Sequence, residues 1–187
     1  MIRNKRTEGS YYQCIRHCSI GCCVTMMSYV FLIVSVIVLL IASSISGPLH
    51  ASCKATWTFG EGCADVNKAL VDQINKWKGP DGCKNGGEKC LYALKSSSAT
   101  EIKATHETPK KHYVDDVSFE FSGSGSSCTV KGYSTSETWY AVLDYGTNYC
   151  NMFNLIQGAG LDKVSGYKEE TSDSICTQRS SANCEIY

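Results

Sequence analysis

The sequence predicts an extracellular α+β domain, stapled by disulfides and preceded by one transmembrane helix. Three observations carry this prediction: an uncharged apolar run, eight cysteines beyond that run, and one amphipathic helix pattern followed by alternating strand patterns. Four parts are expected along the chain: a cytosolic, basic, Cys-rich tail (1–23), the transmembrane helix (24–42), a linker (43–52) and the extracellular domain (53–187).

The apolar run at 24–42 contains no charged side chain. At about 1.5 Å per residue, a helix of this length crosses a hydrocarbon core of about 30 Å. Arg and Lys are frequent in 1–23, and none follows the run until Lys54. The positive-inside rule therefore predicts a cytosolic N-terminus and an outer C-terminal domain, at the cell membrane or a secretory-pathway membrane. The alternative is a signal peptide whose cleavage releases a secreted form.

The cysteines fall into two groups, which the apolar run separates. An even number of cysteines in an oxidising compartment predicts four disulfides, for which 105 pairings are possible. Short intervening loops make Cys83–Cys90 and Cys176–Cys184 the expected local bridges. The outer cysteines are Cys53, Cys63, Cys83, Cys90, Cys128, Cys150, Cys176 and Cys184.

The inner group consists of Cys14, Cys18, Cys22 and Cys23. The first three recur every fourth residue, so in a helix they share one face. Cysteines beside a membrane helix are common sites of palmitoylation, which we expect here. The alternative is four reduced, unmodified thiols.

One amphipathic helix is expected at Cys63–Lys78. Its apolar residues fall at i, i+4, i+8 and i+11, and charged or polar residues cover the other faces. Gly79 and Pro80 end it, because glycine accepts a left-handed cap and proline cannot donate the next hydrogen bond. The apolar stripe consists of Val66, Leu70, Ile74 and Trp77.

The remainder of the outer domain alternates in the manner of strands. Val117, Phe119 and Phe121 share one face and are predicted to join the core. We expect 128–133 to pair with 138–145. One helix laid on such an antiparallel sheet is an α+β layout. The expected strands are 55–59, 91–94, 101–107, 116–121, 128–133, 138–145 and 149–156.

Two histidines, His106 and His112, flank a turn centred on Pro109. Across a hairpin they would face each other, and with Glu107 or Asp115 they could bind a metal. The simpler interpretation is a solvated hairpin with two exposed histidines, because two histidines rarely suffice as a metal site.

A cluster of aromatic residues forms the other candidate site. Adjacent side chains of a strand point to opposite faces, so one face of this cluster is available for binding. The alternative is a thin sheet with half-buried tyrosines. The cluster consists of Tyr133, Trp139, Tyr140, Tyr145 and Tyr149.

Three stretches resemble a family of small uncharacterised animal proteins that carry an N-terminal membrane anchor and a cysteine-rich extracellular domain. The longest stretch is 136–151, SETWYAVLDYGTNYCN, and the others are 67–70, NKAL, and 180–184, SSANC. The resemblance covers most of the outer domain. It implies no activity and therefore transfers no site residue.

These observations predict a membrane-anchored binding or structural module without catalytic activity, acting on an unknown protein or ligand partner. The alternative is an extracellular enzyme with a non-standard site around His106 and His112. The formal net charge is zero, and no basic surface is expected, which argues against nucleic acid binding. No cofactor is expected, since 158–163 lacks the third glycine of a dinucleotide fingerprint.

Overall fold

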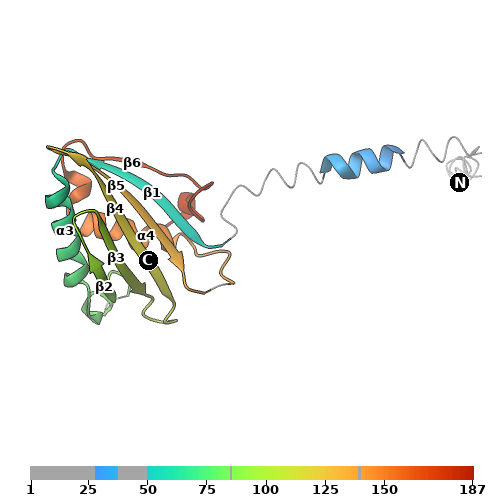
Figure 1. The fold of residues 1–187 in the computed structure, drawn as a ribbon. Helices are drawn as coiled ribbons and strands as arrows, with labels where there is room; N and C mark the ends of the chain where they lie inside the picture. The colour runs from blue at the N-terminus through green and yellow to red at the C-terminus, as the bar shows by residue number, and fades with distance from the viewer. Residues whose placement is uncertain (1–27, 38–49, 85, 139) are drawn as a thin grey trace, which may run out of the picture. The chain divides into compact units, whose positions relative to one another are not determined.

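A computed structural model describes residues 28–37, 50–84, 86–138 and 140–187 of the chain. The chain divides into two compact units, Met1–Ile45 and Ser46–Tyr187. Figure 1 shows the second unit as a sheet with two helices packed against it.

In the first unit, residues 28–37 are helical and their side chains are exposed. Of the helices within the described residues, none combines the length and the apolar character that a membrane span requires. The rest of the expected transmembrane helix at 24–42 lies outside the described residues. The expected lipidation sites Cys14, Cys18, Cys22 and Cys23 lie outside them as well.

The second unit is an α+β domain, as predicted. Within its described residues, six antiparallel strands form one sheet in the order β2-β3-β4-β5-β1-β6. Inward and outward residues alternate in burial along β1, β4 and β5, so one face of the sheet is covered and the other is open. The strands are β1 (Ser52–Phe59), β2 (Tyr92–Ser97), β3 (Glu101–Glu107), β4 (Val114–Ser124), β5 (Ser127–Ser136) and β6 (Lys168–Glu170).

Helix α3 (Cys63–Lys76) confirms the predicted amphipathic helix. Val66, Leu70 and Ile74 are buried against the sheet, and Trp77 follows as the C-cap and packs on the core. The predicted strand residues Val117, Phe119 and Phe121 are buried on the same side. The largest fully buried side chains beside them are Trp57, Phe59, Tyr92, Ile102 and Met152.

A second helix, α4 (Thr147–Gly158), occupies the segment where a strand was predicted at 149–156, and that prediction is wrong. Three asparagines recur every third residue here, at positions 148, 151 and 154, and all are fully buried. In a sequence, asparagines are read as solvent-exposed residues. Because they stand in the buried stripe of α4, this segment lacks the apolar periodicity that predicts a helix. The prediction of a single helix on the sheet is therefore corrected to two, and α4 touches both α3 and the sheet.

The described residues of the expected strand at 138–145 form no strand, so that prediction is wrong for them. Strand β5 runs on to Ser136 and pairs with β4 on one side and with β1 on the other. Because both of its edges are occupied, the following residues have no free ladder to join. Residues 140–146 form instead a loop beside the end of the sheet, where the Ala51 amide donates to the Ala141 carbonyl over 2.8 Å.

All eight outer cysteines are paired, as predicted. Cys83–Cys90 is confirmed as a local bridge, whereas Cys176–Cys184 is wrong. The C-terminal segment returns past two different elements, so each of its cysteines meets a distant partner. The long-range bridges are Cys53–Cys176, Cys63–Cys128 and Cys150–Cys184. Short 3₁₀ turns at Pro80–Cys83, Leu161–Lys163 and Arg179–Ser181 complete the described elements.

Candidate functional site

The asparagines of α4 build a buried polar layer between this helix and the sheet. Asn151 Nδ2 donates to Asp115 Oδ2 of β4 over 2.8 Å and to Ser134 Oγ of β5 over 3.3 Å. Ser134 Oγ donates in turn to Asn148 Oδ1 over 2.7 Å. Asn148 Nδ2 donates to Asp144 Oδ2 over 2.8 Å, so the chain of hydrogen bonds links two carboxylates through four side-chain contacts.

Asp115 ends this layer as a buried acid that faces a cavity. Its side chain occupies an inward position of β4, in line with Val117 and Phe119, and the residue is 4 % exposed. Burial is the main cause that raises the pKa of its carboxyl. Hydrogen bonds from Asn151 and Ser136 oppose that rise. The protein thus keeps a carboxyl where an apolar side chain would ordinarily stand, and hydrogen bonds support its charge.

A second carboxyl reaches the same cavity from the loop before β2. The Cys83–Cys90 bridge and a hydrogen bond of 2.8 Å from the Cys90 amide to the Glu88 carbonyl fold this loop. Burial raises the pKa of the Glu88 carboxyl, the charge of Asp115 raises it further, and Lys110 opposes the rise. Glu88 Oε2 is buried and has no hydrogen-bond partner among the described residues.

His106 of β3 contacts the loop that carries Glu88. Its Nε2 lies 2.8 Å from the Glu88 carbonyl, which accepts, so Nε2 carries the proton. Its ring stacks on Tyr92 with the two ring centroids 4.4 Å apart, and the Tyr92 hydroxyl donates to the Asn151 carbonyl over 3.0 Å. Burial lowers the pKa of His106, so the imidazole is neutral near pH 7 and holds the Glu88 loop by an uncharged hydrogen bond.

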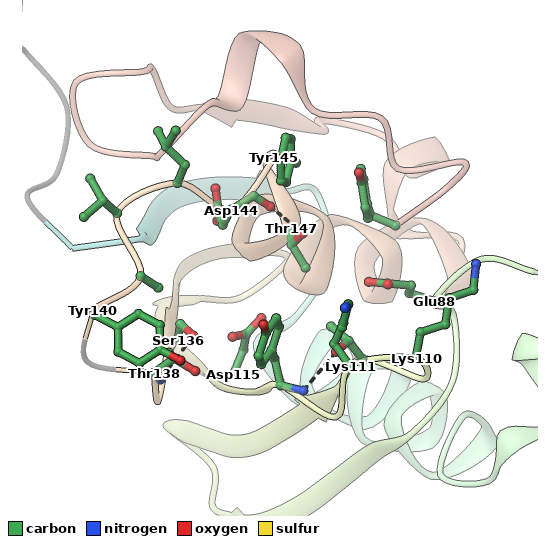
Figure 2. A pocket seen from close by; sticks show the side chains of 16 residues that line it. Glu88, Lys110, Lys111, Asp115, Ser136, Thr138, Tyr140, Asp144, Tyr145 and Thr147 are labelled. Atoms are coloured by element: carbon green, nitrogen blue, oxygen red, sulfur yellow. Dashed lines mark hydrogen bonds between the residues drawn. The ribbon is translucent and has the colours of Figure 1, made fainter.

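The cavity itself has a volume of about 600 Å³ and lies between the β3–β4 turn, the 140–146 loop and the start of α4. Figure 2 shows the Asp115 and Glu88 carboxylates directed into it from different sides. Two lysines of the turn, Lys110 and Lys111, line its edge. Its walls carry apolar side chains that are largely exposed to solvent: Tyr113, Tyr140, Val142, Leu143 and Tyr145.

The 140–146 loop is held in place by the C-terminal segment. Gln178 Oε1 accepts the amides of Asp144 and Tyr145 over 3.0 and 2.8 Å. Tyr145 and Gly146 both adopt positive φ, at 56° and 78°. A Cβ at Gly146 would lie 2.5 Å from the Ala182 side chain, so the tight turn requires glycine. The sharp turn projects Tyr145 outward at the mouth of the cavity (Figure 2).

Only part of the predicted aromatic cluster reaches this cavity. Tyr140 and Tyr145 line it. Tyr133 lies on the open face of the sheet, with Lys54 Nζ 5.8 Å from its ring centroid. Tyr149 is buried beneath Arg179 and donates to Glu169, and Trp139 lies outside the described residues. The four described residues of the cluster therefore fall on two separate surfaces, Tyr140 and Tyr145 on one and Tyr133 on the other, and Tyr149 belongs to the core.

The two histidines do not face each other. His106 is buried on the inner side of β3, whereas His112 is exposed in the β3–β4 turn, with φ of 56°, and pairs with Glu107. The hairpin itself is confirmed, with His106 opposite Asp115 in the register. Among the described residues, no group of three or more His, Cys, Asp or Glu is arranged to hold a metal ion.

Sequence reasoning missed several residues of the cavity. Asp115 carried a usable signal, because it stands at an inward position of an alternating strand, where an acid is unusual. The sequence holds no such signal for Glu88 and Tyr113, because their place in the cavity depends on where two loops meet. The missed residues include Glu88, Lys110, Lys111, Tyr113, Val142, Leu143 and Asp144.

No protein-family model matches the chain. No curated protein matches it. Among solved structures, the chain is similar to the exocytosis-sensitive phosphoprotein pp63/parafusin, a phosphoglucomutase from Paramecium in its open form. The identity is 13% and the TM-score 0.31, over 63% of this chain and 22% of that one. The chain thus spans about a fifth of that protein, and a likeness at this level carries no argument about fold or activity.

Proposed function

We propose that this protein is a membrane-anchored binding module without catalytic activity, whose outer domain holds a protein or ligand partner in the cavity beside α4. The single observation that supports this best is the group of exposed apolar side chains above a buried carboxyl. Binding sites combine an apolar wall with few, well-placed polar groups. An exposed apolar patch of this kind is costly for a solvated domain unless a partner covers it.

Photo-crosslinking from one wall residue tests the proposal. A benzophenone amino acid replaces Tyr145 at the cavity in the full chain on intact cells, and the matched control carries it at Tyr133 on the open face of the sheet. We expect crosslinked products of defined mass from position 145 and none from position 133. Equal products from both positions, or none from either, would contradict a partner site at the cavity.

The anchor is proposed on sequence grounds, from the uncharged run at 24–42 and the basic residues before it. Epitope tags at the two ends of the chain test the topology in intact cells. Only the C-terminal tag is expected to stain before permeabilisation. Recovery of the C-terminal tag from the medium would indicate the alternative, a secreted form after signal cleavage.

We also propose that Cys14, Cys18, Cys22 and Cys23 carry thioester-linked lipid. Their place beside the apolar run supports this. Hydroxylamine-dependent acyl exchange is expected to label the wild-type chain and to lose its signal in a quadruple Cys→Ser variant. An equal signal from the two chains would contradict the proposal.

An extracellular enzyme remains the second candidate, and one observation favours it. Glu88 and Asp115 both have a raised pKa in a cavity, as catalytic acids do. The original basis of this alternative was His106 beside His112, but His106 is buried in β3 whereas His112 is exposed in the β3–β4 turn. A chromogenic hydrolase panel assayed with wild type and Asp115→Asn separates the candidates, since turnover that disappears in the variant would indicate an enzyme.

A further inference from the structure

Two acids at the floor of the cavity, Asp115 and Glu88, form no ion pair with a described Lys or Arg side chain. Asp115 is buried, and its hydrogen-bond donors among the described residues, Asn151 and Ser136, are neutral. Glu88 Oε2 is buried and has no hydrogen-bond partner among these residues. Lys110 and Lys111 are exposed, and neither forms an ion pair with these acids in the described part of the chain. A cation that entered the cavity would therefore meet two carboxyls that have no ion-pair partner among the described residues.

Electrostatics supports the same conclusion. The charges of Asp144 and Glu137 raise the pKa of Asp115 beyond the effect of burial, and Asp115 raises the pKa of Glu88 despite the nearby Lys110. Acidic charge therefore outweighs basic charge around the floor. An entering cation would stabilise both carboxylates, because an opposite charge at close range favours the ionised form.

The walls of the cavity indicate which kind of group would carry the cation. Tyr113, Tyr140 and Tyr145 are three of the four tyrosines that line the cavity, and Val142 and Leu143 line it as well. Tyrosine rings attract a cation through their faces and cover an alkyl stem through their area. Apolar walls above acids thus match a ligand with a positive end and an apolar stem.

We propose that the cavity binds an alkylammonium group, with the amine at Asp115 and Glu88 and the stem against Tyr113, Tyr140 and Tyr145. This inference rests on the proposed function, since it names the chemistry that the same cavity takes. The group could be a free amine or the lysine side chain of a partner protein. Both present the same ammonium on an apolar stem.

Calorimetric titration of the full chain in mild detergent tests the proposal with three probes of equal length: hexylammonium, hexanol and hexanoate. We expect hexylammonium to bind at least about tenfold more tightly than hexanol, because a hydrogen bond between charged groups is stronger than one from a neutral hydroxyl. Hexanoate is expected not to bind. Asp115→Asn and Glu88→Gln should each reduce the preference for the amine over the alcohol, whereas Tyr145→Ala should weaken both probes.

Glu88 lies in a surface loop, so Glu88→Gln remains informative if Asp115→Asn fails to fold. Equal binding of hexylammonium and hexanol, tighter binding of hexanoate, or no binding of any probe would overturn the proposal. The crosslinking from Tyr145 would still report a partner in each of these cases, so the proposed function is tested separately. A short acetylated peptide with one lysine, compared with its norleucine analogue, distinguishes a protein side chain from a free amine as the source.

Discussion

The two helices that cover the sheet bury different kinds of side chain. Helix α3 places Val66, Leu70 and Ile74 against the strands, whereas α4 places Asn148 and Asn151 there beside its apolar residues. Burial of apolar area stabilises the α3 side directly. A buried amide contributes little net stability but fixes the direction of its partners. The α3 side is therefore built for stability, and the α4 side for placing Asp115 at the cavity.

Each side also has its own disulfide, and removing these bridges should have the largest effect. Cys63–Cys128 joins α3 to β5, and Cys150–Cys184 joins α4 to the C-terminal segment. Their sequence separations are 65 and 34. Chain entropy predicts that the double Cys→Ala variant at either bridge lowers the free energy of unfolding by about 4 kcal/mol. Urea denaturation measures this loss.

The local Cys83–Cys90 bridge is the matched control, with a separation of 7. Its double Cys→Ala variant is expected to lose only about 2 kcal/mol, because a short loop restricts the unfolded chain less. A loss at Cys150–Cys184 no greater than at this control would contradict the view that the C-terminal segment secures the α4 side.

Truncating an apolar residue of α3 comes next. Leu70 is fully buried, so Leu70→Ala should lower the free energy of unfolding by about 2–5 kcal/mol through lost burial and a residual cavity. Lys68→Ala, on the exposed face of the same helix, is expected to change it by less than about 0.5 kcal/mol. If the two variants were equally stable, the apolar side would not be the main source of stability.

On the α4 side, Asn151→Ala should cost less, about 1–3 kcal/mol, because it leaves Asp115 without its closest buried donor. We also expect the variant to lose the preference for hexylammonium, since the direction of the carboxyl is no longer fixed. If Asn151→Ala lowered the free energy of unfolding more than Leu70→Ala in the same denaturation series, the α4 side would contribute more to stability than the α3 side, contrary to our interpretation.

A smaller effect is expected in the pH dependence of stability. Burial raises the pKa of Asp115 above 3.8, so the folded protein holds this proton more tightly than the unfolded chain does. The contribution of the protonated form is complete below pH 3.8 and is lost as the pH rises through the folded-state pKa. The Asp115→Asn variant has no carboxyl at this position to lose a proton. Its free energy of unfolding should therefore decline less from pH 3.8 to about pH 7 than that of the wild type.

Asp116→Asn is the control for this measurement. Asp116 follows Asp115 in β4, and its side chain is exposed on the open face of the sheet. It should keep the wild-type dependence. A steeper decline in Asp115→Asn than in wild type would contradict the raised pKa.

The smallest effect on stability is expected at the cavity wall. Tyr145→Ala removes an exposed side chain, so the free energy of unfolding should change by less than about 0.5 kcal/mol. Partner binding should nevertheless weaken, because the ring supplies much of the apolar wall. Denaturation combined with titration checks both parts, and a strong loss of stability would show that Tyr145 serves the fold rather than a partner.

Local pattern in the sequence was sufficient for a large part of this fold. The stripe at Val66, Leu70 and Ile74 predicted α3, and the alternation around Phe119 predicted β4, because each signal depends on neighbours a few residues apart. The even number of outer cysteines predicted complete pairing, and the short loop predicted Cys83–Cys90.

Tertiary structure alone decided the rest. Helix α4 is hidden in the sequence because its asparagines bond to protein groups rather than to water: Asn148 and Asn151 to β5 and β4, and Asn154 to the Tyr187 carbonyl. Cys176 and Cys184 find partners at β1 and α4, which no local spacing reveals. The cavity joins Glu88, Asp115 and Tyr145 from three distant segments, and only the packing of those segments brings two acids beneath an apolar wall. Contacts between residues far apart in the chain leave no periodic signal, so the fold must place them.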